Sequence, residues 1–206
     1  MQRHPRGTRV RVTLFDYGAG NLHSLAKALQ GRGRVVVIEP NPIRAIETDF
    51  LVLPGVGAFG AASAALAPGR DAMATAIRAG LPTLGICLGM QLLCDASDEG
   101  PGDGLGIVPG RVEKLRARHT PQIGWNTIDD TRDVLFAAPR LGIAYYANRY
   151  VCRPTDPDVV IAWSVHEADR FPAAIRCGRV IGVQFHPEKS SAPGLAFLQR
   201  VIAEAA

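Results

Sequence analysis

Short apolar runs alternate with helix-forming stretches along the first half of the chain, and this alternation restricts the possible folds more than any other feature. The apolar runs cover residues 10–15, 35–38, 50–53 and 83–86, and the helical stretches cover 22–30, 61–79 and 88–95. We expect Asn21 to cap the first helix, and Pro68 and Gly69 to interrupt the second. Strand, helix and strand at these lengths predict βαβ units and a parallel sheet.

The second half of the chain is richer in strand-like runs. Turns containing Gly, Pro and Asp separate these runs, which favours some antiparallel pairing. The runs cover residues 111–115, 124–128, 143–151, 159–164, 173–176 and 180–185, and a last helix covers 194–205. No repeat or linker divides the sequence. We therefore expect a single α/β domain of three layers over residues 10–206, after a flexible basic extension over residues 1–9.

Composition and charge argue against several classes of partner. The chain has 206 residues, of which 47% are hydrophobic, and a formal net charge of +4. Its basic residues are spread out and form no block that would follow a phosphate backbone, so we expect no nucleic-acid partner. No apolar run approaches the roughly 20 residues that span a bilayer, so we expect no membrane association and a cytoplasmic location.

The four cysteines lack the spacing of a metal site or of a secreted disulfide framework. We therefore expect no bound metal, and reduced thiols in a reducing compartment. Cys94, Cys152 and Cys177 can each be explained as a small buried hydrophobic residue. The surroundings of Cys87 in the sequence are different.

Cys87 lies in the segment Gly85-Ile86-Cys87-Leu88-Gly89, directly between a buried apolar run and a helix. A side chain in such a turn is pushed out at the carboxyl end of the strand, where open α/β sheets bind ligands. The start of the helix favours a thiolate, and the Leu88 amide can stabilise an oxyanion there. This pattern predicts a nucleophile; a structural cysteine in a packed turn is the alternative.

A histidine and a glutamate in the segment VIGVQFHPEKS have the types that such a thiol needs. His186 follows the apolar run 180–185, and Glu188 comes two residues later. A thiol needs a base to take its proton, and the imidazole needs a carboxylate to fix its tautomer. A histidine at a strand end is by itself more often a solvated loop residue. Together with Cys87, the two residues complete the set required for a catalytic triad.

A further glycine-rich turn, LPGVGAFG, follows the apolar run 50–53. Its amides could face the same site and donate the second half of an oxyanion hole. A phosphate-binding loop is the competing interpretation, but neither a GK[ST] nor a GxGxxG pattern follows the strand.

Taken together, these motifs resemble those of the class I (triad) glutamine amidotransferases. GICLGMQ resembles their nucleophile turn, and GVQFHPEKS resembles their His–Glu segment. Within that class, DYGAGNLHSL, LPGVGAF, PQIGWN and QFHPEKS are similar to the glutaminase subunits of imidazole glycerol phosphate synthase. The resemblance runs from about Val12 to the last helix. It implies a three-layer, flavodoxin-like α/β fold with a central, mostly parallel sheet and a smaller antiparallel sheet.

The resemblance also implies a role for each matching residue, with glutamine as substrate and no cofactor. Cys87 attacks the carboxamide, His186 moves protons and Glu188 orients His186. The remaining roles are oxyanion donors at Leu88 and at the Gly55–Val56 peptide, glutamine binding at Gly57, Gln91 and Glu99, and partner contacts at Asn21, Trp125 and Lys189. The oxyanion peptide of similar enzymes can require a flip, which keeps the glutaminase nearly silent without its partner.

The implied partner is a separate (βα)₈-barrel cyclase that forms a heterodimer with this chain. The cyclase would use the ammonia to make imidazole glycerol phosphate and an aminoimidazole carboxamide ribonucleotide in histidine biosynthesis. A glutaminase subunit of another synthase, such as one for anthranilate or a vitamin, is the first alternative, and the PGVG and GWN motifs argue against it. A catalytically silent interaction subunit is the second, and the complete set of Cys87, His186 and Glu188 argues against it.

The sequence departs from similar subunits at two places. It reads Asn148-Arg149 where relatives commonly have His-Ser in VHSY, and Gln122 where relatives often have His in PHxGWN. Gln122 keeps hydrogen-bonding capacity but loses a titratable group. Neither change affects the triad. If the histidine of VHSY supports the interface or the peptide flip in relatives, we expect regulation to differ in this chain.

Overall fold

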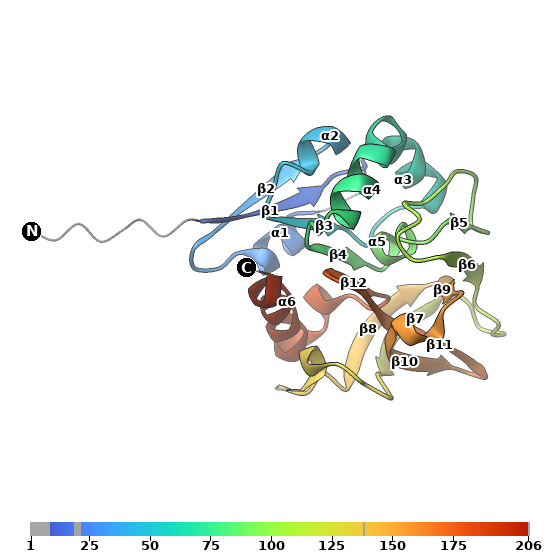
Figure 1. Cartoon of the computed structure of the whole chain (residues 1–206). Helices are drawn as coiled ribbons and strands as arrows, with labels where there is room; N and C mark the ends of the chain where they lie inside the picture. Colours follow the sequence, from blue (N-terminus) through green and yellow to red (C-terminus); the bar gives the residue numbers. More distant parts are fainter. Residues whose placement is uncertain (1–8, 19–21, 138, 206) are drawn as a thin grey trace, which may run out of the picture.

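The computed structural model describes residues 9–18, 22–137 and 139–205, so nearly all of the expected extension 1–9 lies outside the described residues. Within them, a seven-stranded sheet has the order β10-β11-β12-β4-β3-β1-β2 and runs through the centre of the molecule (Figure 1). Its strands are β1 (Val10–Phe15), β2 (Arg34–Glu39), β3 (Phe50–Leu53), β4 (Thr83–Ile86), β10 (Val160–His166), β11 (Asp169–Cys177) and β12 (Val180–Val183).

The pairing in this sheet is parallel from β2 to β12 and antiparallel beyond it. β1 pairs in parallel with β2 and β3, and β4 pairs in parallel with β3 and β12. β11 is antiparallel to both β10 and β12. The predicted βαβ units are therefore confirmed, and the carboxyl ends of β1, β3, β4 and β12 meet at one edge of the sheet.

Helices cover both faces of the sheet and make three layers. α1 and α6 lie on one face, and α2, α3 and α4 lie on the other (Figure 1). The helices are α1 (His23–Leu29), α2 (Pro42–Ala45), α3 (Phe59–Leu66), α4 (Arg70–Arg78), α5 (Leu88–Gln91) and α6 (Ser191–Ala205).

Alternate side chains of the strands fill a separate hydrophobic core on each face. In β3, Phe50 and Val52 pack toward the core on the α1 and α6 side, while Leu51 and Leu53 pack toward the other core. All four are buried. A continuous apolar run is the pattern expected of a strand buried on both faces, which explains why the predicted bounds of this strand match the structure.

Two smaller sheets extend the second half of the chain. β5 (Ala96–Ser97), β6 (Gly110–Lys114) and β9 (Tyr150–Pro154) form one, and β7 (Gln122–Thr127) and β8 (Ile143–Asn148) form the other. The single strand predicted over residues 143–151 is wrong, because the chain changes sheets at Arg149. Up to Asn148 it pairs with β7, and from Tyr150 it pairs with β6.

Three local predictions need correction or fall outside the structure. The helix predicted over residues 88–95 ends at Gln91, so α5 is a single short turn. Cys177 is exposed, whereas Cys94 and Cys152 are buried as expected. Asn21, the predicted N-cap, lies outside the described residues, and Leu22 occupies the N-cap position of α1.

The predicted interruption of the long helix at Pro68 and Gly69 is confirmed, because a short 3₁₀ turn separates α3 from α4 there.

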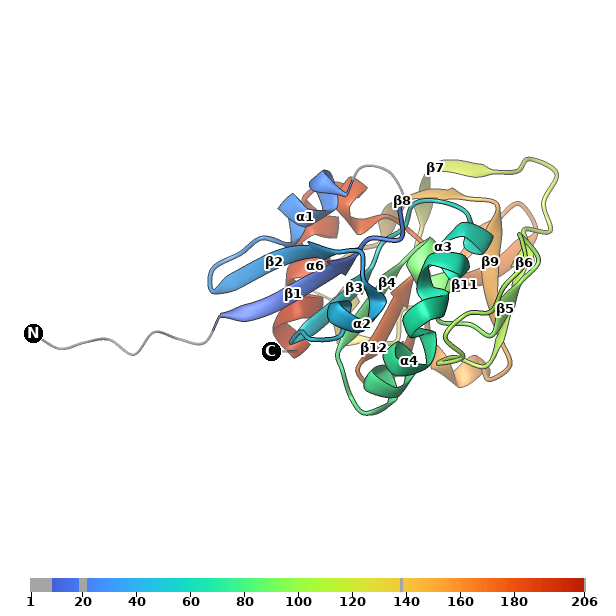
Figure 2. The same ribbon diagram turned by 90° about the horizontal axis from the view of Figure 1, so that it is seen from above.

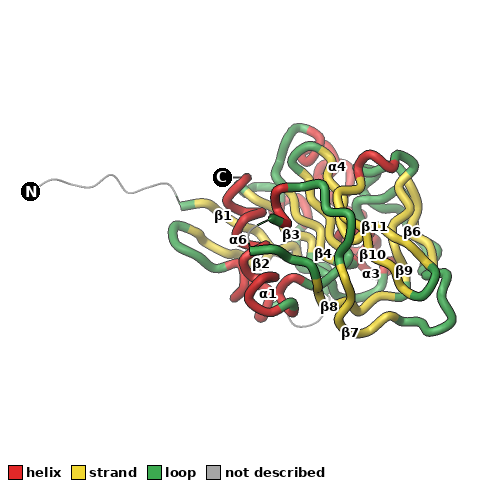
Figure 3. The backbone as a smooth tube through the Cα atoms, turned by 90° about the horizontal axis from the view of Figure 1, so that it is seen from below, coloured by secondary structure: helices red, strands yellow, loops and turns green. Residues whose placement is uncertain are grey.

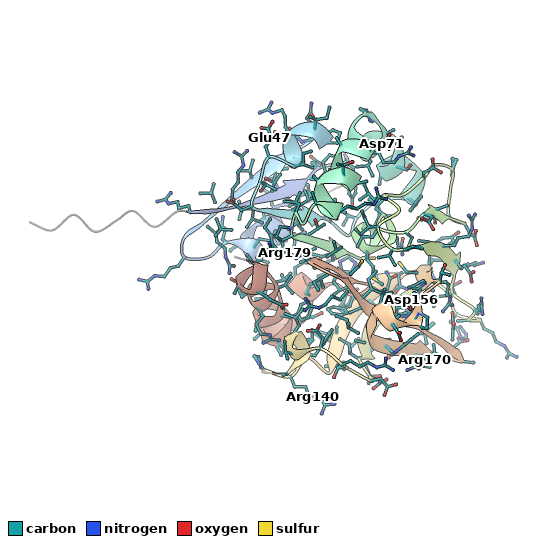
Figure 4. The ribbon with its side chains drawn as sticks, in the orientation of Figure 1. Glu47, Asp71, Arg140, Asp156, Arg170 and Arg179 are labelled. Carbon is teal, nitrogen blue, oxygen red and sulfur yellow. The ribbon has the colours of Figure 1, made fainter. Side chains whose placement is uncertain are left out.

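Charged side chains are distributed around the whole surface. Those labelled in Figure 4 are exposed and come from distant parts of the chain: Glu47, Asp71, Arg140, Asp156, Arg170 and Arg179. Among the described residues, no helix combines the length and the apolar character needed to cross a bilayer.

Candidate active site

Cys87 occupies the turn between β4, in the middle of the sheet, and α5. Its backbone has φ of +48°, a conformation that non-glycine residues rarely adopt, and its amide donates to the Val183 carbonyl at 2.6 Å. This tight turn directs the side chain away from the sheet at the carboxyl ends of the parallel strands. Strained backbone of this kind is characteristic of functional sites, and the structure places it where the sequence predicts.

Two glycines make this turn possible because the backbone packs so closely around it. A Cβ added to Gly85 would lie 2.6 Å from the Gly89 carbonyl oxygen, and one added to Gly89 would lie 2.0 Å from the Leu53 carbonyl oxygen. No side chain fits at such distances. The two glycines therefore allow α5 to begin directly above the ends of β3 and β4.

His186 and Glu188 form a buried pair beside this turn. The imidazole Nδ1 lies 2.8 Å from a carboxylate oxygen of Glu188, and the two side chains are only 3% and 8% exposed. The backbone of His186 is fixed on both sides, since its amide donates to the Tyr145 carbonyl and its carbonyl accepts from the Ser190 hydroxyl. The carboxylate thus fixes the tautomer of an imidazole whose position the backbone already sets.

The electrostatics of the site favour a protonated His186. Burial alone would lower the pKa of His186, but hydrogen bonds to Cys87 and Glu188, together with the negative charges of these two groups, raise the pKa to about 10. Part of this stabilisation requires negative charge on the sulfur. The geometry therefore places a strongly basic imidazole against the thiol, which is the arrangement that activates a cysteine for attack on a carbonyl carbon.

The turn that follows β3 lies directly against this pair. A Cβ added to Gly55 would lie 2.9 Å from Cβ of Cys87 and 3.0 Å from Cε1 of His186. Only a residue without a side chain brings its backbone this close to both groups. The structure thus places the predicted oxyanion peptide, Gly55–Val56, beside the thiol and the imidazole.

A cavity of about 240 Å³ opens above Cys87. Its walls include all the residues predicted to bind glutamine and to hold the oxyanion, alongside the thiol and the imidazole. The lining residues are Gly55, Val56, Gly57, Cys87, Leu88, Gln91, Glu99, Ala147, Asn148, Arg149, Tyr150, His186 and Lys189. A cavity of this size fits an amino acid, with the thiol at its floor.

The predicted glutamine-binding side chains are held in place by the protein. The Gln91 amide donates to the Tyr150 carbonyl at 2.9 Å, and Glu99 accepts the Phe59 amide at 3.0 Å. Gly57 has φ of +109°, which only glycine adopts without strain. These contacts preorganise the cavity walls before a ligand binds.

The sequence reasoning missed Gln184, which contacts the thiol directly. Its buried amide donates to Sγ of Cys87 at 3.4 Å and accepts from the Gln91 amide at 3.3 Å. One signal could have identified it: Gln184 is a polar residue in the apolar run that leads to His186.

Two of the predicted partner-contact residues lie side by side on the surface next to the cavity. Trp125 on β7 is 51% exposed and packs edge-on against Tyr145 on β8, with ring centroids 6.3 Å apart. The Lys189 ammonium lies 5.9 Å from the centre of the same Tyr145 ring. Tyr145, which the sequence reasoning missed, connects the two. Asn21, the third predicted contact, lies outside the described residues.

This surface is part of an exposed apolar face on β7 and β8. Ile123, Trp125 and Ile143 are each more than half exposed. Figures 2 and 3 both show β7 and β8 on the side of the molecule where α1 also lies. We call the face formed by Ile123, Trp125, Ile143 and Tyr145 the β7–β8 face.

The two departures from similar subunits are neighbours in the structure. Gln122 and Asn148 are directly opposite each other in the β7–β8 register, and both are buried. The side-chain oxygens of both lack a hydrogen-bond partner among the described residues. Two amides thus occupy adjacent positions at which the sequence resemblance implies histidines, and Asn148 also lines the cavity.

The residues described by the structure contain no cluster of His, Cys, Asp and Glu that could hold a metal ion.

Comparison with known proteins identifies the family of the chain. The sequence matches the family profile "Glutamine amidotransferase class-I" over residues 13–204. It is 42% identical to the imidazole glycerol phosphate synthase subunit HisH of Pyrococcus furiosus over 92% of this chain and 96% of that protein. It is 43% identical to HisH of Symbiobacterium thermophilum over 91% of each.

A solved structure, described as a crystal structure of glutamine amidotransferase, has a TM-score of 0.72 at 19% identity and covers 94% of this chain and 97% of that one. A likeness at this identity shows the shared fold, including the three layers and the central sheet. The profile match and the identity to the HisH proteins together show that the chain belongs to the class I glutamine amidotransferase family, in the group of the HisH subunits of imidazole glycerol phosphate synthase.

Proposed function

We propose that this chain hydrolyses glutamine to glutamate and ammonia at Cys87, and that it delivers the ammonia to a separate cyclase subunit in histidine biosynthesis. The observation that carries the proposal is the contact between Cys87, His186 and Glu188 at the floor of a cavity large enough for an amino acid. The relatives named above are subunits of imidazole glycerol phosphate synthase. This name indicates the synthase reaction in which we propose that the ammonia is used.

In the first half of the reaction, the thiolate of Cys87 attacks the carboxamide carbon of glutamine. The carbonyl oxygen becomes an oxyanion, which the amides of Leu88 and of the Gly55–Val56 peptide stabilise. His186 gives its proton to the departing nitrogen, so ammonia leaves and a thioester remains on Cys87. Glu188 stabilises the imidazolium before transfer and holds the ring for it.

In the second half, water hydrolyses the thioester. His186, now neutral, takes a proton from the attacking water, and the same two amides stabilise the second oxyanion. Glutamate leaves, and Cys87 and His186 regain the thiolate–imidazolium pair. The sum of the two halves is glutamine and water going to glutamate and ammonia.

The same proposal assigns the β7–β8 face to the partner. Ammonia in neutral water is mostly ammonium, which is not a nucleophile, so it must travel to the second site without entering bulk solvent. An exposed apolar face beside the cavity is suited to contact with another protein. Trp125 and Lys189 are the residues through which we expect a (βα)₈-barrel cyclase to dock, with both subunits in the cytoplasm.

The experiment that tests this function compares two ammonia sources. The wild-type complex of this chain with its cyclase subunit should make product from glutamine and also from an ammonium salt. Cys87→Ser should abolish the reaction with glutamine and leave the reaction with ammonium unchanged, because the cyclase does not use the thiol. Loss of both activities, or of neither, would contradict the assignment of Cys87.

A further inference from the structure

Gln184 is a buried residue that contacts the nucleophile and has no part in the reaction as proposed above. It lies between the end of β12 and His186, and its side chain is fully buried. Its backbone amide donates to the Ala173 carbonyl on β11 at 2.9 Å. Its side-chain amide donates to Sγ of Cys87 at 3.4 Å. A residue anchored on the central sheet thus holds a polar group against the sulfur.

The other end of the Gln184 amide contacts a residue of the predicted glutamine site. Gln91 lies on α5 and lines the cavity above Cys87. Its side-chain nitrogen donates to the Gln184 oxygen at 3.3 Å and to the Tyr150 carbonyl oxygen at 2.9 Å. These contacts form one continuous chain of hydrogen bonds, from the backbone of β9 through two buried amides to the sulfur.

The direction of each hydrogen bond in this chain is fixed by the carbonyl at its far end. A backbone carbonyl can only accept, so the NH₂ end of Gln91 must face Tyr150. The second hydrogen of that nitrogen then points at Gln184, which must present its oxygen. The NH₂ end of Gln184 is left for the sulfur. A flipped Gln184 amide would place nitrogen against nitrogen, so a single orientation satisfies all three contacts.

This arrangement restricts two groups that the reaction must align. The Cys87 side chain has one rotatable bond between its backbone and Sγ, with three staggered positions for the sulfur. An N–H donor at a fixed place favours the position in which the sulfur faces Gln184. Both hydrogens of the Gln91 amide are engaged within the protein, which leaves its carbonyl oxygen for a ligand in the cavity.

We propose that Gln184 is a positioning residue for glutamine hydrolysis, because it holds the Cys87 sulfur and the Gln91 amide in a fixed relation to each other. A glutamine bound against Gln91 then presents its carboxamide carbon to the sulfur. The inference rests on the proposed function and adds a residue to it. Attack requires the reacting atoms to lie about 3–3.5 Å apart in an aligned geometry, so the rate depends strongly on this relation.

The first test is the variant Gln184→Met, which keeps a buried side chain of similar length and removes both the donor and the acceptor. In the complex with the cyclase, kcat for glutamine should fall by roughly tenfold, the factor that one neutral hydrogen bond is worth at the upper end of its range. The reaction with an ammonium salt should stay at the wild-type rate. An unchanged kcat for glutamine would overturn the inference.

Two alkylating reagents separate the alignment of the sulfur from its reactivity. Iodoacetamide reaches the thiol from any direction, whereas a chloroketone analogue of glutamine reacts from the glutamine-binding position. In Gln184→Met, labelling of Cys87, followed by mass spectrometry, should slow by roughly tenfold with the analogue and by less than about twofold with iodoacetamide. Equal slowing with both reagents would overturn the inference, because Gln184 would then change the reactivity of the sulfur and not its alignment.

A second variant, Gln184→Glu, tests the donor to sulfur by its pH dependence. A protonated carboxyl group offers the same donor and acceptor as the amide, whereas a carboxylate can only accept. Burial raises the pKa of a carboxyl group, so the introduced group should support turnover at low pH and lose this capacity as it ionises. The ratio of variant to wild-type rate, which cancels the titration of Cys87 and His186 in wild type, should fall by about tenfold between about pH 6 and pH 9. A ratio independent of pH would overturn the role of the donor.

Gln199→Met is the matched control. The Gln199 amide donates to the Ala28 carbonyl at 2.8 Å and so joins α6 to α1. This variant should lose stability without a change in kcat or in the ratio of the two labelling rates, and a similar change in both methionine variants would overturn the inference. Absence of glutamine hydrolysis by the wild-type complex would instead overturn the proposed function, whatever the labelling rates are.

Discussion

Replacement of Glu188 tests the electrostatic part of the site most directly. The carboxylate is 8% exposed, and one of its oxygens lies 2.8 Å from Nδ1 of His186. Its other oxygen has no hydrogen-bond partner among the described residues, so the group serves this contact alone. The variants Glu188→Gln and Glu188→Ala remove, respectively, the charge and the whole interaction.

The expected magnitudes follow from the type of contact that is lost. A hydrogen bond to a charged group contributes about 1.5–3 kcal/mol and a neutral one about 0.5–1.5 kcal/mol, so Glu188→Gln should cost about 1–1.5 kcal/mol. This corresponds to a fall of roughly fivefold to tenfold in kcat. Glu188→Ala leaves a buried imidazolium unpaired, at a cost of about 3–5 kcal/mol, which corresponds to about two to four orders of magnitude.

The assay is glutamate release by the complex with the cyclase, with the ammonium-dependent reaction as the control for an intact partner. A second readout is the alkylation rate of Cys87 at neutral pH. The hydrogen bond and charge of Glu188 help to raise the pKa of His186, so their loss lowers this pKa. A His186 with a lower pKa is a weaker base toward the Cys87 thiol, so alkylation should slow in both variants.

One result would refute this reasoning. If Glu188→Ala kept kcat and the alkylation rate within about threefold of wild type, the loss would be below about 0.7 kcal/mol. The backbone contacts of His186 with Tyr145 and Ser190 would then orient the imidazole by themselves, and Glu188 would have no role in the chemistry.

Three further predictions concern the oxyanion turn, the docking surface and the fold. Gly55→Ala should abolish glutamine hydrolysis, because its Cβ would lie 2.9 Å from Cβ of Cys87. Gly100→Ala is the control: its Cβ would have its nearest neighbour at 3.6 Å, and the rate should stay unchanged. Lys189→Ala should weaken binding of the cyclase in a calorimetric titration without lowering the melting temperature; unchanged affinity would contradict its place in the interface. Asp169→Asn should lower the free energy of unfolding, measured in urea, by about 3–5 kcal/mol because it removes the charge paired with Arg153 at 2.6 Å, and a loss under about 1 kcal/mol would contradict this.

The sequence by itself determined the parallel half of the fold and the position of the turn that carries Cys87. The predicted bounds of β1, β3 and β4 agree with the structure. β3 shows the reason most clearly, because a strand buried on both faces is a continuous apolar run. The position of Cys87 was equally readable. Cys87 lies in a glycine-flanked turn between a strand and a helix only a few residues apart. Such a turn directs its side chain out of the sheet, and this follows from the local sequence alone.

Tertiary structure alone decided what surrounds that thiol. Nothing local indicates that the chain changes sheets at Arg149, because the run is uniformly strand-like and only its two pairing partners differ. Gln184 differs from its neighbours only as a polar residue in an apolar run, and the fold alone places its amide against the sulfur.

The same holds for Tyr17, which lies in the DYGAGNLHSL motif. Its hydroxyl donates to the Pro54 carbonyl, and this contact forms because β1 ends beside the turn that follows β3. The pattern of strands, turns and helices follows from the backbone preferences and the hydrophobic residues of each short segment. Contacts between side chains distant in sequence depend on how strands are ordered in the sheet, and that order brings Tyr17, the oxyanion turn and Cys87 together.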